Sequence, residues 1–426
     1  MGSIPACSKR YRWMQKEYSK KNKDLLFGIV DADLIDNGTR HPNLVLMKIA
    51  GYLRDHNISY KLILNDHEDL KKISYLYVSK VFTFSKEPEF LLNKKINPQN
   101  IFKGGTGYYA EEENPELFIQ QRDLDMNRLE NDPNLPGFSM IHQMPDYFLY
   151  GEYINNKLSG EKSPQRYKDY ISFSIGFLTR GCIRKCPFCI NKNSEYVYEY
   201  SRLTDFVDKT RPMIYLWDDN FLASKNWKIL LLELQATNKP FQFRQGLDIR
   251  LLNEEKASLL SKSKYYGDFI FAFDQLKDKE LIVSKLKIWK QYTKKATKLY
   301  LFCGYEISDD KSIINDILNL FERIEILMTF GCLGYVMRHE DYRNHPLNNI
   351  YVQIARWCNQ PQFYKKMSFK EFIDRNQFWK KTDIKCIPLK TYEEFMDYFS
   401  ECSPILNRYF NMKYEETISP ALWKLQ

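Results

Sequence analysis

The stretch GCIRKCPFC, residues 181–189, gathers three of the nine cysteines of this 426-residue chain in one short segment. Cys182, Cys186 and Cys189 follow the spacing C-x3-C-x2-C. The other six cysteines stand alone and far apart along the sequence. The clustered thiols therefore have no fourth partner nearby in the sequence. A site that takes three thiolate ligands has to be identified.

Three thiolates can serve a site that is deliberately left open. A structural zinc site takes four ligands, and its cysteines usually come in two CxxC-type pairs. A [4Fe–4S] cluster normally takes four cysteines, so three of them would ligate three irons and leave the fourth iron open to a chelating ligand. We therefore expect Cys182, Cys186 and Cys189 to be metal ligands and catalytic residues.

The sequence around these cysteines alternates between strand and helix patterns. Six stretches are typical of strands: 171–179, 213–219, 241–248, 268–274, 298–306 and 332–337. Four stretches with apolar residues at helical spacing lie between them: 226–238, 253–263, 279–296 and 311–328. Six β/α units in about 170 residues predict a partial barrel of six strands instead of eight. The cysteines would follow the first strand, at the end of the barrel where such folds place their chemistry.

An earlier part of the chain predicts a second parallel sheet. Strands are expected at 25–35, 59–66, 74–84 and 100–109, with a helix at 43–57. Strand–helix–strand alternation favours parallel pairing with right-handed crossovers, as in a Rossmann-like open sheet. The predicted fold class is therefore α/β, with an N-terminal Rossmann-like open parallel sheet, a partial (β/α)6 barrel and a mostly helical C-terminal region.

The predicted boundaries follow from these patterns. Residues 1–24 form an N-terminal extension, 25–150 the Rossmann-like domain, 170–350 the barrel and 351–426 the helical C-terminal region. Residues 110–169 are polar and irregular in pattern, and 151–169 are expected to be a linker.

Composition limits the classes of protein to consider. About 44% of residues are apolar and 27% are charged, as in ordinary soluble globular proteins. The sequence contains no run of about 18 apolar residues, so no membrane span is expected. The N-terminus lacks the apolar core of a signal peptide. A cytoplasmic location is expected, where thiols stay reduced, so clustered cysteines indicate a metal or catalysis. The net charge of +9 slightly favours an anionic substrate.

The cysteine spacing, the aromatic residue before the last cysteine and the predicted barrel resemble the radical S-adenosylmethionine (radical SAM) superfamily. The resemblance implies a [4Fe–4S] cluster whose open iron binds the amine and carboxylate of S-adenosylmethionine. Reductive cleavage of the cofactor then gives methionine and a 5′-deoxyadenosyl radical, which abstracts hydrogen from a substrate. The pattern of residues 25–109 is similar to the cobalamin-binding domain that precedes many barrels of this superfamily.

By the same resemblance, Phe188 would lie beside the adenine. Asp218, Asp219 and Asn220 follow the second strand, where the family often has a GGE-type motif for the methionyl amine; the glycines are missing here. The remaining implied cofactor-binding residues end later strands: Gln245, Asp248, Asp274, Glu306, Met337 and Arg338.

Structural alternatives remain open for three of these residues. Asp219 could cap the next helix, and Asp248 could pair with Arg250. A carboxylate clamp and a surface ion pair are both compatible with Arg338.

Cobalamin is an alternative cofactor that the sequence does not favour. The turn GGTGY, 104–108, falls where the similar domain often has a glycine pair, although a plain tight turn explains it as well. The Asp-x-His-x-x-Gly motif that supplies a cobalt ligand in some relatives is absent from the sequence. Four polar residues after the first strand could face the barrel or serve turn chemistry: Asp31, Asp33, Asp36 and Asn37.

The predicted function is a radical SAM enzyme that modifies an unidentified organic substrate by hydrogen abstraction. One alternative is a cobalamin-dependent radical SAM methyltransferase, and another class is a non-catalytic iron–sulfur or zinc module that binds nucleic acid. Expected partners are an electron donor such as flavodoxin or ferredoxin and a small-molecule, nucleotide or nucleic-acid substrate, with no membrane. The N-terminal sheet is expected to cap the mouth of the barrel.

Overall fold

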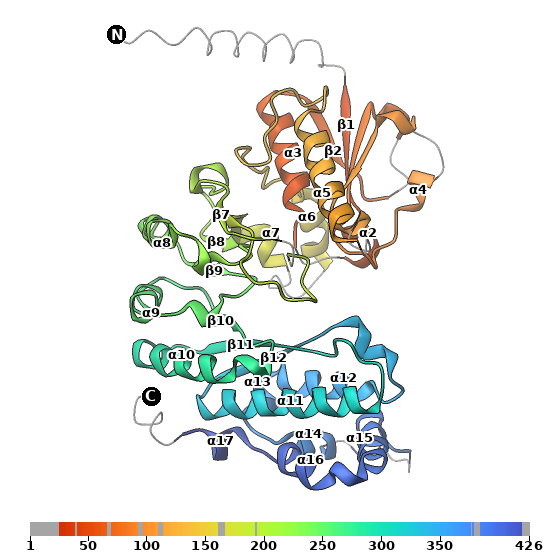
Figure 1. Cartoon of the computed structure of the whole chain (residues 1–426). Coiled ribbons are helices and arrows are strands. Elements are labelled where there is room, and N and C mark those ends of the chain that lie inside the picture. Colours follow the sequence, from red (N-terminus) through yellow and green to blue (C-terminus); the bar gives the residue numbers. More distant parts are fainter. Residues whose placement is uncertain are drawn as a thin grey trace. The chain divides into compact units, whose positions relative to one another are not determined.

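The computed structural model (Figure 1) describes residues 25–38, 41–65, 70–92, 97–109, 114–160, 167–191, 194–375, 377–378 and 384–419. The predicted extension 1–24 lies outside the described residues. The chain forms two compact units, here called the first unit (Met1–Leu178 and Tyr200–Tyr215) and the second unit (Thr179–Glu199 and Leu216–Gln426).

A four-stranded parallel sheet is the centre of the first unit. Its strands are β1 (Leu26–Asp31), β2 (Ser59–Leu62), β3 (Tyr75–Ser79) and β4 (Ile101–Gly104). The strand order is β2-β1-β3-β4, with β1 between β2 and β3 and every pair parallel. The predicted α/β class and the predicted open parallel sheet are confirmed.

Helices complete the first unit. The α-helices are α2 (Ala32–Asn37), α3 (Leu44–Asp55), α4 (Glu89–Leu92), α5 (Pro115–Glu130), α6 (Gly151–Gly160) and α7 (Lys168–Ser172). Short 3-10 turns lie at η1 (Leu70–Lys72), η2 (Pro98–Asn100), η3 (Thr106–Tyr108) and η5 (Leu203–Asp205). The strand predicted over 25–35 ends at Asp31, because the Asp31 side chain accepts a hydrogen bond from Leu34 N and caps α2.

The region 110–169 is more ordered than its polar pattern predicted. It contains the long helix α5, of which Leu129 is buried in the core beside a half-buried Met126. Such a narrow apolar stripe on a 16-residue helix gives little periodic signal. The predicted linker 151–169 begins as helix α6, and Ile154 and Tyr167 are buried in the same core. Residues 161–166 of that linker lie outside the described residues.

The boundary between units also differs from the predicted one at residue 170. Strand β5 (Phe173–Gly176) belongs to the first unit. Arg211 accounts for this, because its buried guanidinium donates to the carbonyls of Tyr170, Phe173 and Tyr147 at 2.8, 3.1 and 2.8 Å. These hydrogen bonds connect the segment 200–215 to the start of β5 and to Tyr147 and Tyr170, which precede β5 in the sequence.

The six predicted barrel strands form two sheets of three. One has the order β5-β8-β9, with β8 at Met213–Leu216 and β9 at Phe241–Phe243. The other has the order β10-β11-β12, all parallel, with strands at Phe269–Ala272, Thr297–Cys303 and Leu333–Arg338. Parallel bridges from Phe241 to Tyr265 and from Leu247 to Phe271 connect β9 and its following segment to the second sheet.

A glycine explains why the strand predicted over 241–248 is short. After Phe243 the chain turns, and Gly246 has a φ of +86°, which favours glycine. A Cβ at this position would also lie 3.2 Å from the ring of Tyr300. The chain re-enters the sheet only at Leu247, whose N–H donates to Ile270 O at 2.9 Å.

Helices follow the later strands of the second unit as predicted. They are α8 (Trp227–Ala236), α9 (Glu254–Ser261), α10 (Lys279–Tyr292) and α11 (Asp310–Thr329), and they follow one another along these strands in Figure 1. Short turns lie at η6 (Phe221–Ala223), η7 (Ile249–Leu251), η8 (Leu276–Asp278), η9 (Glu340–Asn344) and η10 (Ser400–Cys402).

The C-terminal region is helical, as predicted. Its helices are α12 (Asn349–Cys358), α13 (Pro361–Tyr364), α14 (Phe369–Asp374), α15 (Ile387–Tyr398), α16 (Ser403–Phe410) and α17 (Tyr414–Thr417). They pack on α11 through aromatic side chains, with Phe321 stacked on Trp357 and tilted against Phe410. Within the described part of the chain, no helix has the length and apolar character needed to cross a membrane.

Candidate functional site

A two-stranded ribbon forms the base of the cysteine loop. Strand β6 (Thr179–Arg180) pairs antiparallel with β7 (Tyr198–Glu199), so the chain enters and leaves the loop side by side. Gly181 follows β6 with a φ of +89°, and a Cβ there would lie 2.3 Å from the carbonyl oxygen of Tyr196. Only glycine allows the entering chain to pass the returning one this closely.

The three predicted ligands all lie on this loop and are half-buried free thiols. Cys182 Sγ accepts from the N–H of Arg184 at 3.3 Å, and Cys189 Sγ accepts from the N–H of Asn191 at 3.4 Å. Burial raises the pKa of Cys186 above its ordinary value and that of Cys189 to about 11. Both thiols are therefore protonated at neutral pH in the metal-free protein, and ligation would release their protons.

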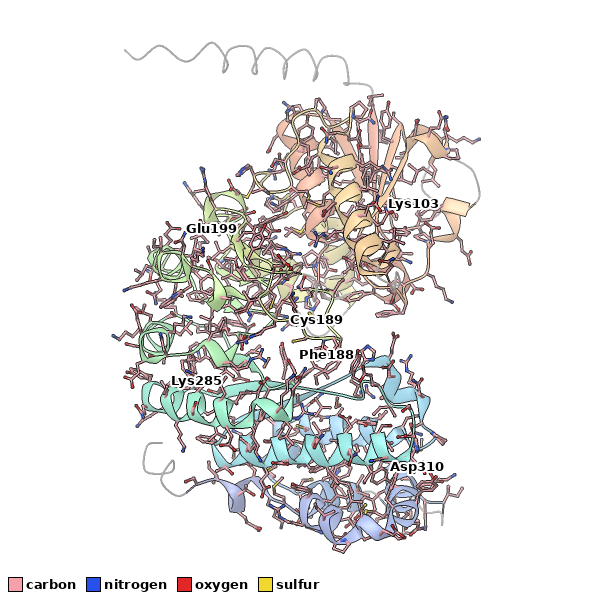
Figure 2. All side chains as sticks on the ribbon, viewed as in Figure 1. Lys103, Phe188, Cys189, Glu199, Lys285 and Asp310 are labelled. Atoms are coloured by element: carbon pink, nitrogen blue, oxygen red, sulfur yellow. The ribbon has the colours of Figure 1, made fainter. Side chains whose placement is uncertain are left out.

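The thiols do not converge as the ligands of one ion. In the described ranges of the chain, no three His, Cys, Asp or Glu side chains are placed to hold a metal ion together. Phe188 and Cys189 lie next to each other on the loop in Figure 2. As a donor set, three soft thiols on one loop suit iron–sulfur chemistry.

The two aspartates after β8 hold the entrance to the loop. Asp218 is buried, and its Oδ1 accepts from Thr179 N at 2.6 Å and Thr179 Oγ1 at 2.7 Å. Asp219 Oδ2 accepts from Gly181 N at 2.8 Å and lies 3.5 Å from Arg180 Nε. These carboxylates have structural partners at the positions where the resemblance implies cofactor binding. The helix-cap alternative for Asp219 is wrong, since Asn226 occupies the N-cap position of α8.

Asn220 is placed differently from the two aspartates before it. It is 3% exposed, and its Nδ2 donates to Cys182 Sγ and to Asp248 Oδ2, both at 3.4 Å. Its Oδ1 is buried and has no hydrogen-bond partner among the described residues. Buried polar atoms are nearly always paired, so an unpaired acceptor beside a predicted ligand is a candidate contact for a donor from a bound molecule.

Asp248 is the centre of an ion-pair network beside the cysteine loop. Its Oδ2 lies 2.7 Å from Arg184 Nε, and its Oδ1 lies 2.7 Å from Arg250 Nε. Arg250 also pairs with Asp278 at 2.7 Å. Burial alone would raise the pKa of Asp248, but the two guanidinium groups hold it below its ordinary value. The predicted pairing of Asp248 with Arg250 is confirmed.

Sequence reasoning missed Arg184 as the partner that ties the loop to Asp248. The sequence signal was weak: Arg184 is a basic residue between two of the clustered cysteines, but its partner lies 64 residues further along the chain. The two arginines also place positive charge beside the thiols, and the charge of Arg250 acts to lower the pKa of Cys186. Cations near the loop favour thiolate ligands and an anionic cluster.

Phe188 contacts protein aromatic rings. It stacks on Phe302 of β11 with ring centroids 3.8 Å apart and meets Tyr305 edge-on at 5.9 Å. His339 lies against Phe302 and Tyr305, at 5.8 and 5.0 Å. Along β11 every second residue is only half-buried, and Phe302 is one of these residues. The predicted place of Phe188 beside an adenine stays a prediction.

The remaining predicted residues lie near the carboxyl ends of the later strands. They differ in burial and do not form one contact cluster with the cysteine loop among the contacts described above. Asp274 is half-buried, and burial raises its pKa to about 6. Gln245 and Glu306 are exposed, and Glu306 has a left-handed φ of +54°. Met337 is 38% exposed.

Arg338 lies over an aromatic ring. Its guanidinium is 4.9 Å from the centroid of the Tyr342 ring and donates to Tyr342 Oη at 3.4 Å. This contact differs from both the carboxylate clamp and the surface ion pair considered from the sequence.

In the first unit, the polar residues at the end of β1 and just after it form hydrogen bonds with other residues of the same unit. Asp31 is buried and accepts from Tyr150 Oη at 2.7 Å, and burial raises its pKa to about 7. Asp33 accepts from the N–H groups of Val81 and Phe82 at 2.7 and 3.2 Å. Asn37 Nδ2 donates to Ser85 Oγ at 2.9 Å. Asp36 Oδ2 accepts from Lys86 N at 3.2 Å. Long-range contacts within the first unit therefore account for these side chains, beside the local cap that Asp31 forms with Leu34 N, and simple turn chemistry describes that cap alone.

The glycine turn 104–108 is filled by the chain itself. Gly105 has a φ of +108°, and a Cβ there would lie 2.5 Å from the carbonyl oxygen of Lys80. At Gly107 a Cβ would lie 2.7 Å from the carbonyl oxygen of Phe82. The glycines allow close packing on the loop after β3, which accounts for the turn without a bound ligand.

Comparisons with known proteins add two similar structures. No protein-family model matches the chain, and no curated protein matches it. The chain is similar to the radical S-adenosylmethionine methyltransferase TsrM from Kitasatospora setae, solved with cobalamin and a [4Fe-4S] cluster bound. The identity is 11% and the TM-score 0.45, over 74% of this chain and 72% of that chain. It is also similar to SuiB from Streptococcus suis, at 13% identity and a TM-score of 0.32, over 68% of this chain and 66% of that chain. The proposed function rests on the residues of this chain.

Proposed function

We propose that this chain is a radical SAM enzyme that cleaves S-adenosylmethionine reductively and modifies an organic substrate by hydrogen abstraction. The observation that carries the proposal is the set of three half-buried thiols at C-x3-C-x2-C on one loop, closed at its base by a ribbon. Three thiols suit a [4Fe–4S] cluster with one open iron. When bound, the cluster would supply one electron to S-adenosylmethionine, whose C5′–S bond would break to give methionine and a 5′-deoxyadenosyl radical.

The chain's own residues would hold the two cofactors. Cys182, Cys186 and Cys189 would ligate three irons, with arginine charge beside them. Asn220 Oδ1, buried and unpaired in the described structure, is an acceptor for the ammonium group of the methionyl moiety. Asp274 would be mostly ionised at pH 7, since its pKa is about 6, and could accept from a hydroxyl group.

The aromatic cluster at Phe188 would help to keep water from one side of the loop. Phe188 and Phe302 stack at 3.8 Å, so the segment between Cys186 and Cys189 is fixed against β11. A radical must be kept from solvent to react selectively, and an apolar wall beside the thiols serves that purpose. The electron would come from a reduced flavodoxin or ferredoxin, and the substrate carbon would lose a hydrogen atom to give 5′-deoxyadenosine.

The test is anaerobic reconstitution with iron and sulfide, followed by incubation with dithionite and S-adenosylmethionine. We expect four irons per chain and formation of 5′-deoxyadenosine. The Cys186→Ala variant should lose both, whereas Cys402→Ala, a half-buried thiol of the C-terminal region, should keep both. A Cys186→Ala protein that retains four irons and makes 5′-deoxyadenosine contradicts the proposal.

The same experiment separates the other class of function. A non-catalytic iron–sulfur or zinc module would bind metal through the same thiols but would form no 5′-deoxyadenosine. The turn at Gly105, which is packed against the chain itself, gives no support to a cobalamin-dependent methyltransferase.

A further inference from the structure

The side-chain amide of Asn220 lies between the cysteine loop and a buried carboxylate. Its Nδ2 is 3.4 Å from Cys182 Sγ and 3.4 Å from Asp248 Oδ2. The amide nitrogen carries two N–H groups, so one can point to each acceptor. With only 3% of Asn220 exposed, water has little access to compete for these donors.

The carboxylate of Asp248 determines which end of the amide faces the sulfur. Asp248 is paired with Arg184 and Arg250 at 2.7 Å, so it is an ionised acceptor. A flipped amide would place Oδ1 against this carboxylate, acceptor against acceptor. The Nδ2 group therefore faces Asp248, and its second N–H is directed to Cys182 Sγ.

We infer that Asn220 is a positioning residue whose N–H bonds the Cys182 sulfur of the bound cluster and raises the cluster's reduction potential. The inference rests on the proposed function. Hydrogen bonds to cluster sulfur atoms are one of the means by which proteins set iron–sulfur potentials, because they stabilise the added negative charge of the reduced state.

The donor from Asn220 can be removed without touching the main chain. Cys182 Sγ also accepts from the backbone N–H of Arg184 at 3.3 Å, and Cys189 Sγ accepts from the backbone N–H of Asn191 at 3.4 Å. Those backbone donors survive any substitution at residue 220. A change in potential on substituting Asn220 therefore reports the side-chain hydrogen bond.

The experiment is a redox titration of the reconstituted, full-length protein, monitored by the electron paramagnetic resonance signal of the reduced cluster. Asn220→Leu keeps the size of the side chain and removes the donor, and Asn220→Ala is the second variant. We expect either variant to need a more negative potential, with about tenfold less reduced cluster at a fixed potential, which is about 59 mV for a one-electron couple. The matched control is Asn226→Ala, which removes an amide that bonds Glu199 and should leave the potential unchanged.

A second readout is the coupling of exchangeable protons to the reduced cluster in D2O, which should weaken in Asn220→Leu. If wild-type protein holds no iron, the proposed function fails. If wild type and Asn220→Leu hold four irons at the same potential, only the inference about Asn220 fails. It also fails if both variants lose the iron while Asn226→Ala keeps it, because Asn220 would then be needed for assembly.

Discussion

The two units use the polar groups that follow their parallel strands in opposite ways. In the first unit, Asp31 and Asp33 after β1 accept from the chain's own hydroxyl and N–H groups. In the second unit, Asn220 after β8 keeps a buried oxygen without a partner among the described residues, beside half-buried thiols. Polar residues at a strand end can therefore stabilise the fold or await a ligand, and only their partners distinguish the two cases.

The largest effect is expected from removing the carboxylate of Asp248 in the second unit. Asp248→Ala leaves Arg184 and Arg250 without their shared partner, and removing one partner of a buried ion pair costs about 3–5 kcal/mol of unfolding free energy. Urea unfolding measures this. The control is Asp55→Ala, which breaks an exposed pair with Arg54 and should cost less than about 1 kcal/mol. Similar losses in the two variants would show that Asp248 is not an organising residue.

The next effect concerns pH and the first unit. Burial raises the pKa of Asp31 to about 7 from 3.8, so between about pH 4 and 7 the folded protein binds a proton that the unfolded chain has released. Stability should therefore fall as pH rises through this window, by about 4 kcal/mol at 1.36 kcal/mol per pKa unit. Asp31→Asn cannot ionise and should lose that slope in urea unfolding at about pH 4, 5.5 and 7.

Asp248 should show the reverse sign, which sharpens the comparison. Its pKa lies below the ordinary value, so its stabilisation is present at neutral pH and is lost as pH falls through the folded pKa. For the prediction on Asp31, an Asp31→Asn variant that keeps the wild-type pH slope would mean that the Asp31 carboxylate is not the source of the pH dependence.

A smaller effect is expected at Gly105 in the first unit. Gly105→Ala puts a Cβ 2.5 Å from Lys80 O on backbone with a φ of +108°, and such strain costs about 1–3 kcal/mol. Gly151→Ala in α6 is the control, because its Cβ would meet no atom within 4 Å and should be neutral or stabilising by up to about 1 kcal/mol. Thermal unfolding distinguishes them, and an unaffected Gly105→Ala would indicate that the turn is open.

The smallest expected effect is that of cobalamin, because the turn 104–108 is closed by its own chain. Reconstituted protein incubated with hydroxocobalamin and desalted should show no corrinoid absorption in its ultraviolet–visible spectrum. Retention at micromolar or tighter affinity would reverse this expectation and favour the methyltransferase alternative. Bovine serum albumin treated in the same way controls for non-specific carry-over.

The sheets of both units could be predicted because their strands are short apolar runs bounded by turn residues. The centres of β1, β3, β11 and β12 all lie inside predicted strands. Their ends were less predictable, since they depend on single side chains such as Asp31, which starts a helix where a longer strand was expected. Helix α5 was missed because few apolar residues mark its buried side.

In the candidate site, the motif pointed to the cysteines but not to what surrounds them. Asp248 and Arg184 are 64 residues apart, so no local pattern links them. The roles of Asp218 and Asp219 in holding the loop entrance also depend on tertiary contacts with Thr179 and Gly181. Sequence could place these carboxylates at the strand end, but it could not show that they hold the loop while the amide oxygen of the next residue, Asn220, is left without a partner among the described residues.

The ribbon of β6 and β7 has a consequence for how the protein matures. The pairing of Arg180 with Tyr198 closes the loop through main-chain hydrogen bonds, so the two ends of the loop are held side by side. Part of the entropic cost of bringing the three thiols together would then be met by this main-chain pairing, and correspondingly less of it would fall on the binding of iron.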